Sequence, residues 1–132
     1  MIFWVLALSA CQPSEPVSGL PPEVATLTRP AVSPSGKYRL VLVEGAKDGV
    51  KALSFQVQDA ASSQPVFSAA DLFSTRTKTY FLWDAQDRVW VSAGTQGTFF
   101  WQKEGDAWVR YDFASGAAAL PAFLKQAAPV QH

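Results

Sequence analysis

The feature that most constrains the fold is a motif that occurs twice, 18 residues apart, in the second half of the chain. Both copies have the form F-[LF]-W-x6-W-V, and they begin at Phe81 and Phe99. Each copy holds two short runs of aromatic and β-branched residues separated by polar residues, which is typical of two antiparallel strands and a tight turn. The repeat therefore predicts four consecutive antiparallel strands.

The simplest connections between these strands are two-residue turns, at 86–87, 95–96 and 104–105. With these turns, four tryptophans form a single row across one face of the sheet: Trp83, Trp90, Trp101 and Trp108. Arg88 and Arg110 border this row together with Lys103, and unpaired charges are costly to bury. The sequence therefore predicts a ligand-binding surface of four tryptophans, with Arg88 and Arg110 as cation–π partners.

A competing interpretation of the tryptophan row is that another part of the chain covers it. Burial of a large apolar side chain contributes roughly 1.5–3 kcal/mol, so four exposed indoles would forgo much of a small domain's stability. The cover could come from the preceding strands, the C-terminal segment or the N-terminal segment. A bulge near Gly94 or Gly97 would also move one hairpin's tryptophan to the other face.

The chain before the repeat contains two further alternating segments, 37–43 and 52–58. Asp48-Gly49 between them is a strong signal for a two-residue hairpin turn. This turn places Leu42 opposite Phe55 and Leu40 opposite Val57, so that the two apolar faces coincide. The pattern therefore predicts a β-hairpin with a defined register.

The C-terminal segment, 117–128, is rich in alanine and carries Leu120, Phe123 and Leu124 at roughly helical spacing. It predicts a short helix that packs on the sheet, with Pro121 near its first turn. Together these elements predict an all-β fold: an antiparallel meander of six to seven strands, as a curled sheet or small barrel, with a short C-terminal helix.

The N-terminus reads MIFWVLALSAC and is apolar from Ile2 to Leu8. This run is too short to cross a bilayer, which takes roughly 20 apolar residues, but it fits an export signal that ends in small residues. Leu8-Ser9-Ala10-Cys11 resembles the lipobox of bacterial lipoproteins. The resemblance implies that residues 1–10 are removed and that Cys11 carries a lipid anchor. The alternative is a buried structural cysteine.

Gln12, which follows the cysteine, favours the outer membrane by the same resemblance, with the domain facing the periplasm. Residues 12–36 hold six prolines, a composition that favours extended chain over helix or central strand. The chain is therefore predicted to consist of a signal peptide at 1–10, a lipidated cysteine and proline-rich tether at 11–36, and a folded domain at 37–132.

The composition argues against several classes of function. Eleven basic and eleven acidic residues give a formal charge of zero, which disfavours nucleic-acid binding. The single histidine is His132, and the single cysteine has no partner at metal-ligand spacing. Asp84, Asp87 and Asp106 are expected in or beside turns, where aspartate bonds its own backbone. The sequence predicts a protein that is not an enzyme and carries no cofactor or metal.

The favoured function is therefore non-enzymatic binding of a protein or glycan at the cell envelope through the tryptophan face. One alternative is an inhibitor or immunity lipoprotein against a lysozyme-like enzyme or toxin, since the chain loosely resembles small periplasmic lysozyme-inhibitor lipoproteins. It departs from them in having no cysteine pair for a disulfide. The other alternative is a structural envelope lipoprotein with a buried tryptophan row.

Overall fold

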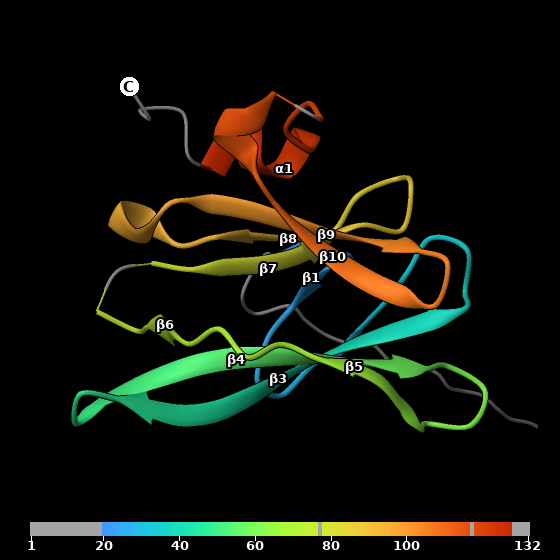
Figure 1. Cartoon of the computed structure of the whole chain (residues 1–132), viewed down its shortest axis with the longest axis horizontal. Coiled ribbons are helices and arrows are strands. Elements are labelled where there is room, and N and C mark those ends of the chain that lie inside the picture. The colour runs from blue at the N-terminus through green and yellow to red at the C-terminus, as the bar shows by residue number, and fades with distance from the viewer. Residues whose placement is uncertain (1–19, 77, 117, 128–132) are drawn as a thin grey trace, which may run out of the picture.

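The computed structural model describes residues 20–76, 78–116 and 118–127. These residues form two antiparallel sheets that pack face to face, and a short helix covers the outer face of one sheet (Figure 1). The predictions for the export signal, Cys11 and His132 lie outside the described residues.

The first sheet contains both copies of the repeat. Its strands in spatial order are β1 (Val24–Ala25), β7 (Tyr80–Trp83), β8 (Val89–Ser92), β9 (Thr98–Glu104) and β10 (Ala107–Asp112). The second sheet has the order β2 (Ala31–Val32), β3 (Tyr38–Lys47), β4 (Val50–Asp59) and β5 (Pro65–Ser68), with β6 (Phe73–Ser74) also paired to β4. The helix α1 spans Ala122–Ala127.

The predicted fold class is confirmed: the described chain is mostly strand, with antiparallel pairing and a short C-terminal helix. The described residues form ten strands rather than six or seven, because three two-residue strands escape a search for alternating runs. They lie in two separate sheets, and neither closes into a barrel.

The β3–β4 hairpin has the predicted register. Leu42 pairs with Phe55 and Leu40 with Val57. Asp48 and Gly49 form the turn with φ angles of 54° and 76°, the left-handed conformation that a two-residue hairpin turn of this kind requires. The apolar residues of both strands consequently face the other sheet.

The register predicted for the β7–β8 and β8–β9 hairpins is wrong by one residue. Trp83 pairs with Val89, and Trp90 pairs with Leu82 and Phe100. The cause is loop length: the loops have three residues, 85–87 and the 3₁₀ turn η2 at Gly94–Gln96. Since side chains alternate between faces, the extra residue in each loop moves Trp90 to the opposite face from the other three tryptophans.

The β9–β10 hairpin turns at Gly105–Asp106, one residue later than predicted. Trp108 therefore pairs with Lys103, and Trp101 pairs with Arg110. This change preserves the face of each residue, so Trp101 and Trp108 still point to the same side of the sheet. The predicted continuous row of four tryptophans does not exist.

The folded domain begins before residue 37, within the predicted tether. Val24 pairs with Leu82 in the first sheet, and Ala31 pairs with Leu40 in the second. Both strands are two residues long and lie at sheet edges, where neighbouring prolines are tolerated. The Arg29 guanidinium donates hydrogen bonds to three backbone carbonyls of this segment, those of Leu20 (3.3 Å), Pro21 (2.7 Å) and Val24 (2.8 Å).

Two apolar clusters hold the layers together. The larger lies between the sheets and includes Leu40, Phe55, Phe81 and three of the tryptophans, Trp83, Trp101 and Trp108. The smaller lies between the first sheet and the C-terminal segment, where Trp90, Phe100 and Leu124 pack together. The C-terminal helix thus packs on the sheet, as predicted, and both faces of the first sheet are covered.

In the part of the chain that the structure describes, no helix has the length and apolar character needed to cross a bilayer.

Candidate functional site

The turn between β7 and β8, residues 84–88, separates two concave surfaces of the molecule. Its loop is closed by a backbone hydrogen bond of 3.0 Å from the Asp84 amide to the Arg88 carbonyl. Asp87 occupies the left-handed region with φ 59°, as the last residue of a three-residue hairpin loop often does. The turn therefore fixes the direction in which Gln86, Asp87 and Arg88 point.

Asp84 organises this turn through its carboxylate, which is buried. Oδ1 accepts from the backbone amides of Gln86 (2.9 Å) and Arg88 (3.0 Å). Oδ2 accepts from Arg88 Nε (2.6 Å) and from the indole Nε1 of Trp90 (2.7 Å). Because four donors share one carboxylate, Asp84 serves to position Arg88 and Trp90, and its oxygens are not available as a catalytic base.

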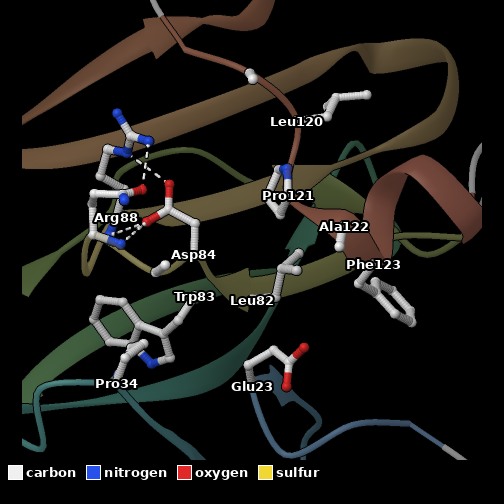
Figure 2. A pocket seen from close by; sticks show the side chains of 13 residues that line it. Glu23, Pro34, Leu82, Trp83, Asp84, Arg88, Leu120, Pro121, Ala122 and Phe123 are labelled. Atoms are coloured by element: carbon white, nitrogen blue, oxygen red, sulfur yellow. Dashed lines mark hydrogen bonds and ion pairs between the residues drawn. The ribbon is translucent and has the colours of Figure 1, made fainter.

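The first concave surface, which we call the helix groove, lies between β7 and the segment leading into α1. It has a volume of about 470 Å³, and Figure 2 shows Leu82, Pro121 and Phe123 around it, with Asp84 and Arg88 at its other end. Its lining is mostly apolar. Arg88 pairs with Asp84, so Glu23 supplies the remaining charge of this groove.

The second concave surface, which we call the end cleft, lies on the other side of the same turn, at one end of the space between the two sheets. It has a volume of about 420 Å³. Its lining residues are Lys37, Tyr38, Gln86, Asp87, Arg88, Gln102, Lys103 and Trp108. Volumes of roughly 300–1,000 Å³ are typical of small-molecule sites.

Aromatic rings form the inner wall of the end cleft. Tyr38 lies edge-on to Trp108, with 5.3 Å between ring centroids, and stacks on Trp83 at 6.3 Å. Tyr38 is half-buried, and Trp108 is 8% exposed, so each offers part of a ring to the cleft while the remainder supports the core. Core packing therefore holds both rings of this wall in place.

Three cationic side chains line the cleft together with these rings: Lys37, Arg88 and Lys103. Arg88 is partly neutralised by Asp84, and the ammonium of Lys103 donates to the Gly105 carbonyl at 2.5 Å, a contact that leaves its charge intact. Among the described residues that line the cleft, Asp87 has the one carboxylate, and it accepts from both the amide and the hydroxyl of Ser35. The end cleft therefore carries net positive charge, and its amides, Gln86 and Gln102, can both donate and accept hydrogen bonds.

The hydrogen bonds between Ser35 and Asp87 also explain how residues from different sheets meet here. Ser35 belongs to the turn before β3, and Asp87 belongs to the turn before β8. The contact ties these two turns together. Together with the packing of the two sheets, it holds Lys37 and Tyr38, at the start of β3, beside Arg88, Lys103 and Trp108.

The structure separates the six predicted ligand-binding side chains. Trp83, Trp90 and Trp101 have 2% exposure or less, and none of them can serve as an open contact surface. Trp90 and Trp101 line neither the helix groove nor the end cleft. The prediction of an exposed tryptophan surface is therefore wrong, because the second sheet covers three of the rings and the C-terminal segment covers Trp90.

The two predicted arginines have different surroundings. Arg88 lies over the Phe100 ring, with 5.5 Å to its centroid, and also lines the end cleft. Arg110 lies over Phe99 at 5.0 Å and forms an ion pair of 2.6 Å with Asp71, away from the end cleft. Both arginines have cation–π partners, but these partners are phenylalanines rather than tryptophans.

Lys37 and Tyr38 are site residues that the sequence did not reveal. They belong to a segment that reads as an ordinary strand start, and only the packing of the two sheets brings them beside Trp108. The sequence pattern does place Lys103 beside the tryptophan row, and with the correct register it also predicts that Lys103 lies near Trp108.

Among residues 20–76, 78–116 and 118–127, no group of three or more histidine, cysteine, aspartate or glutamate side chains could hold a metal ion.

No protein-family description matches the chain, and neither does any curated protein or solved structure with which it was compared.

Proposed function

We propose that this chain is a non-enzymatic binding protein whose end cleft holds an acidic glycan. The observation that carries the proposal is that Lys37, Arg88 and Lys103 line one cleft with Tyr38, which is half-buried, and with the edge of Trp108, which is 8% exposed. Cationic groups attract carboxylate or sulfate groups on a sugar chain, while aromatic rings offer flat apolar surface to sugar rings. The amides of Gln86 and Gln102 add partners for hydroxyl groups.

An acidic glycan fits this cleft better than a neutral one, because the cationic side chains would otherwise lose hydration without compensation on binding. Asp87 keeps its negative charge when it accepts hydrogen bonds from Ser35, but the three cationic side chains that line the same cleft outnumber it.

The experiment compares tetragalacturonate with a neutral oligosaccharide of the same length by isothermal titration calorimetry on the full chain. The double variant Lys37→Gln, Lys103→Gln should weaken tetragalacturonate binding roughly tenfold, since it removes two exposed charge contacts. The matched control, Lys47→Gln with Lys125→Gln, also removes two exposed lysines but leaves the end cleft unchanged.

The proposal fails if both double variants bind alike or if the neutral oligosaccharide binds as tightly. An acidic peptide such as tetraaspartate serves as the third ligand. Tighter binding of this peptide would point to a protein partner and overturn the glycan assignment.

We further propose that Cys11 anchors the chain to the outer membrane, with the domain on the periplasmic side. The lipobox-like Leu8-Ser9-Ala10-Cys11 supports this proposal. Mass spectrometry of the protein from its native host should find an acylated Cys11 as the first residue. An intact Met1 or an unmodified Cys11 would remove the anchor.

The burial of the tryptophans favours a second candidate, a structural envelope component without a ligand. A pull-down from envelope extract separates the two candidates. A structural component should recover the same partners with the Lys37→Gln, Lys103→Gln variant as with the unchanged chain.

A further inference from the structure

A third concave surface, distinct from the end cleft and the helix groove, opens between the two sheets beside β1. We call it the side groove. It has a volume of about 340 Å³. Leu42 and Leu53 contribute to it from the second sheet, Val24 and Tyr80 from the first, and Leu27 from the turn between β1 and β2.

Leu27 is unusual in its position. It lies at the tip of a tight turn closed by two backbone hydrogen bonds between Thr26 and Arg29, of 2.9 and 3.2 Å. Polar residues are the usual occupants of such turns. Leu27 nevertheless places an apolar side chain there that is 49% exposed.

The Arg29 side chain holds the turn that carries Leu27 in place. The hydrogen bonds of Arg29 to the carbonyls of Pro21 and Val24 tie the end of the turn to the backbone before and within β1. An apolar ligand would therefore meet a wall that is already in position, which lowers the entropic cost of binding.

The groove carries one kind of charge. Among the described residues that line it, Lys78 is the one with a charged side chain, and it is exposed. A mostly apolar groove with one exposed cation matches a ligand that has one carboxylate and an apolar chain.

We propose that the side groove binds a single-chain amphiphile of the fatty-acid type, with its acyl chain against Leu27, Leu42 and Leu53 and its carboxylate beside Lys78. This site is independent of the end cleft. Its ligand class is anionic and apolar, whereas the ligand proposed for the end cleft is anionic and hydroxylated.

The test uses dodecanoate as the probe, added to the full chain below its micelle concentration and followed by isothermal titration calorimetry. Affinity should rise from octanoate to dodecanoate, up to about fourfold for each methylene that enters the groove. Dodecyltrimethylammonium, with the same chain and the opposite charge, should bind more weakly than dodecanoate.

Two matched variants locate the site. Leu27→Asp should weaken dodecanoate binding roughly tenfold or more, because it removes apolar wall and adds a repelling carboxylate. Val43→Asp is the control, since the exposed fraction of Val43, 43%, is similar to the 49% of Leu27, and Val43 does not line the groove. Both residues are exposed, so neither substitution disturbs the core, and circular dichroism verifies that both variants are folded.

A third variant tests the cation. Lys78→Gln should weaken dodecanoate binding a few-fold, which is the size expected for an exposed ion pair. The same variant should not weaken the binding of dodecyltrimethylammonium. The proposal is overturned if Leu27→Asp and Val43→Asp have equal affinity for dodecanoate, or if the cationic amphiphile binds as tightly as the anionic one. None of these measurements depends on the acidic glycan of the end cleft.

Discussion

The indole Nε1 of Trp90 donates a hydrogen bond of 2.7 Å to Oδ2 of Asp84, on the face of the sheet opposite to the other three tryptophans. Both residues are buried, where water has little access, so the hydrogen bond gives the indole donor an acceptor and the carboxylate a donor. The pair joins the β7–β8 turn to the cluster beneath the C-terminal segment.

Replacement of Asp84 by alanine should lower the free energy of unfolding by about 2–4 kcal/mol, because it leaves the Trp90 indole and two turn amides without an acceptor. Urea denaturation measures this change. Asp106→Ala is the control, since Asp106 is an exposed turn residue, and its cost should be within about 0.5 kcal/mol of zero. Equal costs for the two variants would contradict the assigned role of Asp84.

Trp83, Trp90 and Trp101 are at most 2% exposed, so most of the tryptophan emission should be blue-shifted and resistant to iodide quenching, whereas Trp108 at the end cleft supplies a smaller part that iodide can reach. The full chain carries Trp4 outside the described residues, so the measurement uses the Trp4→Phe variant, with the same variant in urea as the reference for exposed indoles. Emission that is quenched as easily before unfolding as after it would show that the rings are accessible.

The Tyr111 hydroxyl donates a hydrogen bond to Glu104, and this bond lowers the pKa of the glutamate, with a smaller contribution from Gln102. The same contact raises the pKa of Tyr111. A lowered carboxyl pKa means that the stabilisation by this contact is present above the ordinary glutamate range and is lost as the pH falls through the lowered value.

Tyr111→Phe should therefore move the pKa of Glu104 back towards its ordinary value, which an NMR titration of the Glu104 carboxyl carbon detects. Tyr80→Phe is the matched control because Tyr80 packs edge-on against Phe123 at 5.0 Å and has no contact with Glu104. An unchanged Glu104 titration in Tyr111→Phe would rule out the hydrogen bond as the cause.

Arg29→Met should loosen the N-terminal segment, at a cost of about 1–3 kcal/mol, because three backbone carbonyls lose their donor. Hydrogen exchange should become faster at Val24 and Ala25. Arg76→Met, at an exposed residue outside this segment, should leave their exchange unchanged. If hydrogen exchange in β1 is unaltered in the Arg29 variant, the pairing of β1 with β7 is enough to hold the segment without the Arg29 hydrogen bonds.

The β3–β4 hairpin could be predicted because Asp48-Gly49 specifies both the length and the conformation of its turn. The β7–β8 turn offered no such signal. Asp87 adopts a left-handed conformation there without a following glycine, and the three-residue loop that results reverses the face of Trp90.

The N-terminal strands could not be predicted, since pairs of only two residues leave no periodic pattern among the prolines. The end cleft was also hidden from the sequence. Lys37 and Arg88 are far apart in the chain, and they line the same cleft because the two sheets pack together and Ser35 bonds to Asp87 between them.

The cover on both faces of the first sheet has a consequence for mutational tolerance. All four residues of β8 are buried. In β3, by contrast, buried and more exposed residues alternate from Leu40 to Val43. A saturation scan for folded variants should therefore find tolerance to polar substitutions with a period of two along Leu40–Val43 and no such period along Val89–Ser92. Although both sheets are antiparallel, a strand of the first would tolerate polar substitutions on neither face and a strand of the second on one face.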